Sequence, residues 1–356
     1  MYAVIPFAPD PALATGPTAG SPTLDWVQVP DPILQPGEVL IEVAAAGVNR
    51  ADLLQARGRY APPPGASSIL GLECSGTIVD IHPDTVGTPS HSYDAVRGFA
   101  VGDAVCALLS GGGYAQRVAV PATQVLPVPQ GVSLVDAAGL PEVACTVWSN
   151  LVMTAGLTSG KWVLVHGGSS GIGTMAIQIA RSLGARVLTT ASTSEKLSVA
   201  RNLGAEVAID YSHEDFVIRV MDATDAHGAD IILDVVGGEY LARNISALAD
   251  GGRLVIIGLL GGSRAELDIA SLMAKRAGVI GTQLRNRPQV GPGSKAEVVD
   301  QVRRHVWPLI ESGDILPVIG ARLPIQNAAD AHHMMAGGAV IGKTLLTRGV
   351  PGDQTP

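Results

Sequence analysis

The chain has 356 residues, of which 47% are hydrophobic, and it carries a formal net charge of −8 at pH 7. This length is enough for two domains with their own cores, and the composition argues against a disordered chain. The acidic balance argues against a nucleic-acid-binding surface, which needs clustered Lys and Arg side chains to displace counterions. We therefore expect a globular protein without a nucleic-acid partner.

The chain shows no pattern typical of export or membrane insertion. Its start, Met1 to Phe7, lacks a basic segment followed by a long apolar run. The most apolar stretch, 137–157, is interrupted by Pro141 and Glu142, whereas a spanning helix needs about 20 mostly apolar residues. The scattered cysteines, Cys74, Cys106 and Cys145, predict neither a disulfide framework nor a cysteine zinc site. We expect a soluble protein of the reducing cytoplasm, without membrane association.

The first 130 or so residues are typical of a β-rich domain. Short β-branched runs, such as Val39 to Val43 and Gly76 to Ile81, alternate with Pro and Gly punctuation. Two stretches rich in Pro, Gly, Ser, Thr or Asp, Pro9 to Ser21 and His82 to Gly98, are predicted to be surface loops.

From about Ser133 the pattern changes to strands that alternate with helices, which predicts βαβ units and a buried parallel sheet. The predicted strands are 162–166, 186–190, 206–209, 231–236, 253–258 and 279–282, and the predicted helices are 174–183 and 194–203. Short strands return after about Leu316 and are expected to close onto the first domain. The predicted domains are therefore 1–131 with 317–356, and 132–316.

The most informative motif is a glycine-rich run, Val-Leu-Val-His-Gly-Gly-Ser-Ser-Gly-Ile-Gly, at 163–173. Glycines between a strand and a helix let backbone amides approach a pyrophosphate, which lies at the positive helix end. A glycine pattern alone would fit an ordinary tight turn. Because a strand precedes this run and a helix follows it, we predict dinucleotide binding.

The end of the second strand bears on the choice between NADH and NADPH. Enzymes that use NAD place an acidic residue there for the ribose 2′-hydroxyl, but Ser192 and Thr193 occupy this tip. Glu195 lies beyond the tip and Lys196 follows it. Hydroxyls with an ammonium suit a 2′-phosphate, so we predict NADPH. Helix capping by these hydroxyls is the alternative, and the two roles are compatible.

Nearly the whole chain resembles the quinone oxidoreductases of the medium-chain dehydrogenase/reductase superfamily, in particular the tumour-suppressor-inducible group. The matching runs are 47–65 with its Asn-Arg-Ala-Asp-Leu-Leu motif, 69–76, 108–116, the glycine loop, 209–211 and 341–343. The resemblance implies an α/β protein with a Rossmann doubly wound sheet for the cofactor and a β-rich GroES-like catalytic domain. It also implies a homodimer paired through an edge of the Rossmann sheet.

The resemblance also bears on zinc. Zinc alcohol dehydrogenases of this superfamily have a Cys where Asn49 stands and a His where Leu72 stands, before a shared Glu73. Catalytic zinc needs three protein ligands and an open position. We therefore expect no metal.

The remaining site residues are carried over from the resemblance. The implied cofactor-binding residues are Asn49, Thr146, Ser170, Gly171, Ile172, Ser192, Thr193, Lys196, Tyr211, Gly258, Leu259, Leu260, Leu284 and Lys343. Tyr60 and Ser170 are implied as candidate catalytic residues. A structural role is the alternative for several of them: Asn49 as a turn former, Thr146 as a helix hydroxyl, and Tyr60 packed against the prolines that follow it.

Together these features predict an NADPH-dependent quinone oxidoreductase. Without zinc to stabilise an alkoxide, the acceptor is expected to be an electron-poor small molecule, a quinone or a conjugated carbonyl. Two alternatives stay open. One is an enoyl or alkenal reductase, including a form that acts on a carrier-bound chain; the other is an NADPH-binding structural or sensory protein.

Overall fold

The computed structural model describes residues 1–7, 22–85 and 98–349. The predicted loop Pro9 to Ser21 lies outside these ranges, as does most of the predicted loop His82 to Gly98. The chain divides into two compact units. The first consists of Met1–Cys145, Arg285–Ser312 and Ile319–Pro356, and the second of Thr146–Leu284 and Gly313–Val318.

These units differ from the predicted domains in three segments, because 132–145 and 285–312 belong to the first unit and 317–318 to the second. Hydrogen bonds account for the two longer segments. The backbone amide of Glu142 donates to the Glu73 carboxylate at 2.9 Å. The Arg285 guanidinium donates to the carbonyl of Ser110, and the indole of Trp307 donates to the carbonyl of Pro127.

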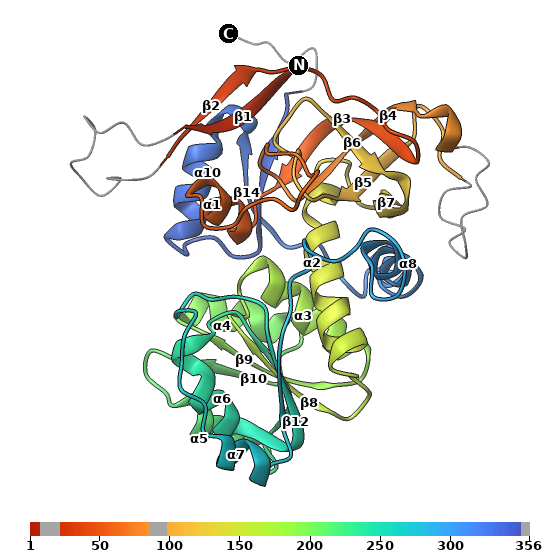
Figure 1. Cartoon of the computed structure of the whole chain (residues 1–356). Coiled ribbons are helices and arrows are strands. Elements are labelled where there is room, and N and C mark those ends of the chain that lie inside the picture. Colours follow the sequence, from red (N-terminus) through yellow and green to blue (C-terminus); the bar gives the residue numbers. More distant parts are fainter. Residues whose placement is uncertain (8–21, 86–97, 350–356) are drawn as a thin grey trace, which may run out of the picture. The chain divides into compact units, whose positions relative to one another are not determined.

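The first unit is built around a mainly antiparallel sheet of seven strands within the described residues. They are β3 (Glu38–Gly47), β4 (Glu73–Ile81), β5 (Ala104–Leu108), β6 (Arg117–Pro121), β7 (Val125–Pro127), β14 (Ile319–Pro324) and β15 (Lys343–Thr347). The order is β14-β15-β3-β4-β5-β7, with β6 paired to β3. Strand β15 pairs antiparallel with β3, so the C-terminal segment joins the N-terminal sheet. A separate pair, β1 (Tyr2–Phe7) and β2 (Thr23–Gln28), carries the N-terminus (Figure 1).

Helices of the first unit flank this sheet. They are α1 (Arg50–Ala56), α8 (Lys295–His305), α9 (Trp307–Glu311) and α10 (Ala328–Ala336). The core includes Ile41, Leu70, Ile78 and Val105, which are completely buried. Helix α2 (Pro141–Val147) carries the chain into the second unit.

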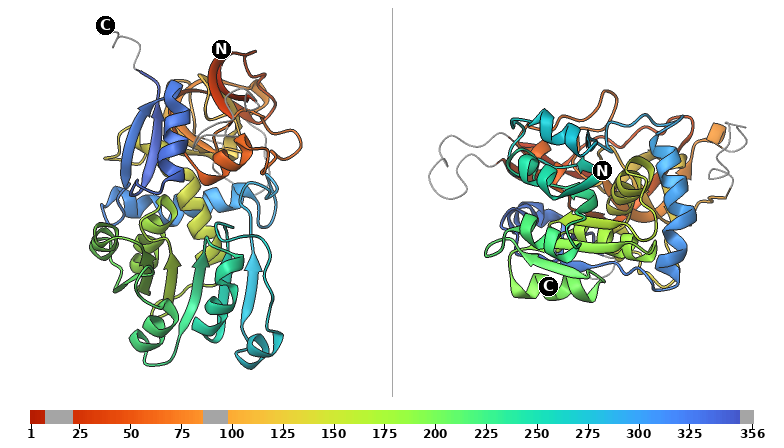
Figure 2. Two further views of the ribbon diagram at one scale, coloured as in Figure 1. Left: turned by 90° about the vertical axis from the view of Figure 1, so that its left-hand side faces the viewer. Right: turned by 90° about the horizontal axis from the view of Figure 1, so that it is seen from below.

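The second unit is a parallel sheet with helices on both faces (Figure 2). Its strands are β8 (Trp162–His166), β9 (Arg186–Ala191), β10 (Val207–Asp210), β11 (Ala229–Asp234), β12 (Leu248–Ile256) and β13 (Gly278–Gly281). Its α-helices are α3 (Gly171–Ser182), α4 (Ser194–Asn202), α5 (Phe216–Ala223), α6 (Leu241–Ala247) and α7 (Ile269–Ala274). The order β10-β9-β8-β11-β12-β13 is that of a doubly wound dinucleotide-binding sheet. The predicted parallel sheet is confirmed.

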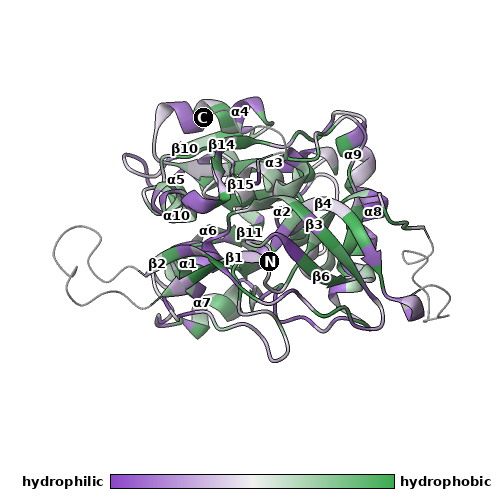
Figure 3. Ribbon diagram, turned by 90° about the horizontal axis from the view of Figure 1, so that it is seen from above, coloured by the Kyte–Doolittle hydropathy of each residue, from purple (hydrophilic) through white to green (hydrophobic). Residues whose placement is uncertain are grey.

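The burial pattern explains why these segments form strands and helices. All five residues of β8 are buried, as expected for a strand covered on both faces. Helix α3 begins where Ser170 caps its first turn, and α4 begins at the Thr193 cap. Figure 3 shows hydrophobic residues concentrated in the strands and hydrophilic ones on outer helical surfaces such as α8.

A π-helix over Trp148–Thr154 continues α2 and was not predicted. The hydroxyl of Thr154 donates to the carbonyl of Ser149 at 2.8 Å, across this wider turn. Asn150 donates to the carbonyl of Thr146 and accepts from the hydroxyl of Thr282. Within the described ranges, no helix combines the length and the apolar character needed to cross a bilayer.

Candidate functional site

The glycine loop connects β8 to α3 through a tight, crowded turn. Gly167 has a φ of +74°, which favours glycine. A Cβ on Gly173 would lie 2.2 Å from the carbonyl oxygen of Gly167, and one on Gly168 would lie 2.0 Å from the Thr189 hydroxyl. Because no side chain fits at either position, the backbone itself forms the surface of the loop, as pyrophosphate binding requires.

Ser170 closes this loop. Its hydroxyl donates to the carbonyl of Gly167 at 2.8 Å and accepts from the amide of Gly173 at 3.0 Å. The amide of Thr174 donates to the Ser170 carbonyl. The first-turn amides of Gly171 and Ile172 therefore remain as anion donors at the positive end of α3. The single hydroxyl hydrogen of Ser170 is used within the loop, which favours a loop-shaping role.

The predicted 2′-phosphate residues gather at the carboxyl ends of two neighbouring strands. Strand β9 ends at Ala191, directly before Ser192, and the amide of Tyr211 donates to the Ala191 carbonyl at 3.2 Å. Thr193 accepts from the backbone amide of Lys196 at 3.3 Å, so it caps α4 as the alternative interpretation stated. Ser192, Thr193, Lys196 and the half-exposed Tyr211 are thus brought to one edge of the sheet.

A buried histidine that the sequence did not identify supports the loop. The Nδ1 atom of His166 lies 3.1 Å from the Thr190 hydroxyl, which also accepts from the amide of Gly167. Its Nε2 atom lies 2.8 Å from the Asn244 side-chain oxygen. Burial lowers the pKa of His166 to about 4. The imidazole is therefore neutral at pH 7, with Nε2–H donating to Asn244 and Nδ1 accepting from Thr190.

The other predicted cofactor residues of the second unit differ in how far they are buried. Gly258 follows β12, and a Cβ there would lie 2.6 Å from the carbonyl oxygen of Val235. Leu259 and Leu260 are exposed, with 57% and 56% of their surface accessible. Leu284 and Thr146 are buried, and Thr146 accepts from Asn150 through its carbonyl.

In the first unit, Asn49 and Lys343 meet at a buried carboxylate. The Lys343 ammonium lies 2.6 Å from the Glu73 carboxylate and donates to the Asn49 side-chain oxygen at 2.8 Å. The Asn49 amide in turn donates to Glu73 at 3.0 Å. A Cβ on Gly47 would overlap this carboxylate, so the chain is closely packed here. The three side chains form one closed polar cluster.

A second buried network lies beside this cluster. Asp52 accepts from the amides of Asn49 and Gly71 and from the hydroxyl of Tyr114. Burial raises the pKa of Asp52 to about 6. The Tyr114 oxygen also lies 3.3 Å from Nε2 of His332, whose pKa burial lowers to about 4. These residues were not among the predicted site residues.

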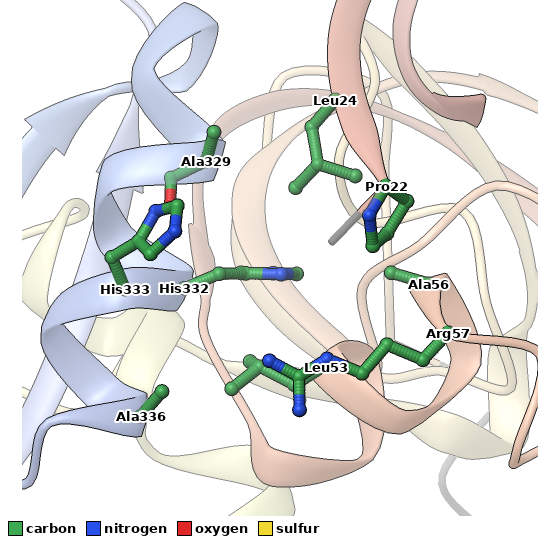
Figure 4. Close-up of a pocket in the computed structure, with 9 residues that line it drawn as sticks. All are labelled: Pro22, Leu24, Leu53, Ala56, Arg57, Ala329, His332, His333 and Ala336. Atoms are coloured by element: carbon green, nitrogen blue, oxygen red, sulfur yellow. The ribbon is translucent and has the colours of Figure 1, made fainter. Parts of the chain in front are cut away.

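Figure 4 shows a small pocket between α1 and α10 that His332 enters from one side. It is lined by Pro22, Leu24, Leu53, Ala56, Arg57, Ala329, His332, His333 and Ala336. None of the predicted site residues lines it. The neighbouring histidines of α10 diverge: His332 is buried, whereas the exposed His333 bonds the carbonyl of Ala329.

Tyr60, the predicted acceptor-side residue, lies against a cation. Its ring centroid is 5.3 Å from the guanidinium carbon of Arg285, and its own side chain is partly exposed. Burial and the Glu142 carboxylate raise the pKa of Tyr60, so its hydroxyl stays protonated at neutral pH. Arg285 also donates to the carbonyl of Ser110, whose hydroxyl accepts from Lys295.

Comparisons with known proteins identify the family. Residues 35–130 match the family described as Alcohol dehydrogenase GroES-like domain, and residues 171–300 match that described as Zinc-binding dehydrogenase. The quinone oxidoreductase of Pseudomonas aeruginosa is 31% identical over 314 residues, which cover 87% of this chain and 91% of that protein. The chain belongs to the quinone oxidoreductase group of the medium-chain dehydrogenase/reductase superfamily. The predicted family and fold class are therefore confirmed.

Two further similarities extend this result. A phenolphthiocerol/phthiocerol polyketide synthase of Mycobacterium tuberculosis is 31% identical over 316 residues, 88% of this chain. The chain spans only 14% of the length of that relative. A mycobacterial protein whose structure is complexed with NADPH is 28% identical, with a TM-score of 0.82, and the match covers 98% of this chain and 100% of that one.

Although one matching family is named for zinc, the residues at the corresponding positions of this chain do not suit the metal. Leu72 has no donor atom, and the Glu73 carboxylate is already paired with the Lys343 ammonium. Among the residues that the structure describes, no group of three or more His, Cys, Asp or Glu side chains is arranged to hold a metal ion.

Proposed function

We propose that the chain is an NADPH-dependent reductase that transfers hydride to a quinone or another electron-poor conjugated carbonyl, without zinc. The observation that carries this proposal is the glycine loop at the N-terminus of α3 together with the hydroxyls and Lys196 at the neighbouring strand ends. This combination provides backbone donors for a pyrophosphate and charge-assisted donors for a 2′-phosphate.

The residues of the second unit fit the cofactor. Gly171 and Ile172 would bind the pyrophosphate through amides that α3 leaves unpaired, while Ser170 holds the loop in shape. Ser192, Thr193 and Lys196 would bind the 2′-phosphate, and Tyr211 would lie beside it. Thr146, Gly258, Leu259, Leu260 and Leu284 remain proposals for the nicotinamide side. NADPH, when bound, supplies the hydride, and the protein orients it and excludes water.

The first unit supports chemistry without a metal. Lys343 already neutralises Glu73, and this pair holds the Asn49 side chain in a fixed orientation. Asn49 is proposed to donate a hydrogen bond near the nicotinamide once the cluster opens to a ligand.

Tyr60 is proposed to contact the acceptor. Its raised pKa keeps the phenol protonated, so the hydroxyl can donate a hydrogen bond to an oxygen that gains negative charge. Quinols can also take protons from water, so Tyr60 is not required to be the sole proton source. Ser170 is the less favoured donor because its hydrogen is bonded to Gly167.

The similarity to part of a polyketide synthase favours one second candidate, an enoyl reductase that acts on a conjugated, carrier-bound chain.

A homodimer is also proposed, through the edge strand β13 and the exposed side chains of α7. Ile269 and Met273 of that helix are 62% and 72% exposed. A cytoplasmic location is proposed because all three cysteines are free thiols.

The test is NADPH oxidation by purified protein with a panel of quinones and enones, with NADH in parallel and a chelator present. Fast turnover of quinones with NADPH is the expected result. Turnover of enones alone would favour the enoyl reductase. Tight NADPH binding without turnover of any acceptor would contradict the proposal and favour a binding protein.

A further inference from the structure

Two cations in the first unit are buried without a carboxylate partner. Arg285 and Lys295 are each only 3% exposed. Neither forms a salt bridge within the ranges that the structure describes, and each bonds only neutral oxygens. A buried charge is normally paired, because the loss of hydration otherwise costs several kcal/mol. This pair of like charges therefore requires an explanation.

Their surroundings do not neutralise them. Arg285 donates to the Ser110 carbonyl through Nε and one terminal nitrogen, to the Gln55 side chain at 2.7 Å, and to the Tyr60 carbonyl at 3.4 Å. Lys295 donates to the Ser110 hydroxyl at 2.5 Å. Burial lowers the pKa of both side chains, and the charge of the Glu142 carboxylate only partly opposes this effect.

Donor hydrogens remain on both cations. A guanidinium has five N–H groups and an ammonium three. The bonds of Arg285 use four of the five and that of Lys295 one of the three, so one guanidinium and two ammonium N–H groups have no acceptor among the described residues. Lys295 is also the first residue of α8, whose N-terminal end adds positive potential. The free N–H groups of Arg285 and Lys295 could therefore be satisfied by one anion that has several acceptor atoms.

We propose that Arg285 and Lys295 form a carboxylate subsite beside Tyr60, and that the natural acceptor is an aromatic or conjugated molecule carrying a carboxylate. This inference rests on the proposed function, in which Tyr60 contacts the acceptor. The guanidinium carbon lies 5.3 Å from the Tyr60 ring centroid, so the positive charge is next to the ring that would contact an aromatic acceptor. In the reaction the acceptor gains one hydride and one proton, NADPH becomes NADP⁺, and the carboxylate is unchanged.

The experiment measures binding of naphthoate, an aromatic carboxylate that cannot be reduced under these conditions, and of neutral naphthamide, to the full chain by calorimetry. We expect naphthoate to bind at least about tenfold more tightly than naphthamide, as a charge-assisted pair predicts, and to weaken with added salt. Lys295→Met should abolish this preference, and Lys295→Arg should keep most of it. Lys161→Met, which removes the same charge from a half-exposed lysine paired with Asp230, should leave the preference unchanged.

Equal binding of the two probes to the unaltered protein would overturn the subsite, as would a preference that survives in Lys295→Met. Turnover of a naphthoquinone carboxylate and its methyl ester separates this result from the proposed function. Preferential naphthoate binding without turnover of either quinone would keep the subsite and reject the reductase. Equal binding and equal turnover would keep the reductase and reject the subsite.

Discussion

The Lys343 ammonium lies 2.6 Å from the Glu73 carboxylate, and the two side chains are only 5% and 0% exposed. They come from opposite ends of the sequence, on β15 and β4, two strands that flank β3. Their pairing therefore ties the C-terminal strand to the N-terminal sheet. Asn49 completes the cluster by bonding both partners.

Removing the lysine should destabilise the first unit. Lys343→Met leaves Glu73 buried and unpaired, which is expected to cost about 3–5 kcal/mol of the free energy of unfolding. Urea unfolding followed by tryptophan fluorescence measures the change. Adding Glu73→Gln to Lys343→Met should restore part of the lost stability. The exposed pair of Arg276 and Asp250 provides the control, since Arg276→Met should cost less than about 1 kcal/mol. Equal losses of unfolding free energy in the two single lysine or arginine variants would show that the Lys343–Glu73 pair is not a buried ion pair that stabilises the first unit.

Lys196 should discriminate between the two nicotinamide cofactors. Lys196→Ala is expected to weaken NADPH binding at least about tenfold, because a charge-assisted hydrogen bond to the 2′-phosphate is lost, and to change NADH binding little. Titration of both cofactors by fluorescence measures the two dissociation constants. Arg201→Ala, in the last turn of the same helix, is the matched control. A similar loss for NADH and NADPH would mean that Lys196 acts through the fold of α4.

Gly173 should tolerate no side chain. In Gly173→Ala the new Cβ would lie 2.2 Å from the Gly167 carbonyl, so either the loop or the start of α3 must move. We expect the cofactor to bind at least about tenfold more weakly, since the loop amides lose their orientation. Gly337→Ala adds a methyl group at 3.5 Å, an ordinary contact distance, and serves as the control. Unchanged cofactor affinity in Gly173→Ala would show that the loop does not bind phosphate.

His166 should contribute to stability in a pH-dependent manner. Its pKa is lowered from 6.5 to about 4, so its contribution is complete above pH 6.5 and is lost as the pH falls through about 4. The shift corresponds to about 3 kcal/mol. Asp52 acts in the opposite direction: its pKa is raised from 3.8 to about 6, so its contribution is present below pH 3.8 and lost as the pH rises through about 6.

The difference in unfolding free energy between the unaltered protein and His166→Gln separates the contribution of the histidine from that of other titrating groups such as Asp52. Urea midpoints at several pH values between about 4 and 7 give the two profiles. The unaltered protein should lose more stability than the variant as the pH falls. Parallel profiles for the two proteins would show that His166 is not held neutral by burial.

Local patterns were enough to predict much of the second unit. Alternation of short apolar runs with amphipathic segments identified each strand from β8 to β13, because a parallel sheet buries its strands on both faces. The glycine spacing at 167–173 identified the phosphate loop, since only glycine fits a backbone this crowded. Ser192, Thr193 and Lys196 could be found because they follow one strand within a few residues.

The tertiary structure decided what depends on contacts between distant segments. His166, Tyr114 and His332 each form a hydrogen bond to a residue at least 62 positions away along the chain, and no local pattern marks them. The charges of Arg285 and Lys295 appear ordinary in the sequence, because only burial makes an unpaired cation unfavourable. The sequence thus determined the family, the sheet and the cofactor loop, whereas folding determined which side chains lose water and therefore which charges must find a partner.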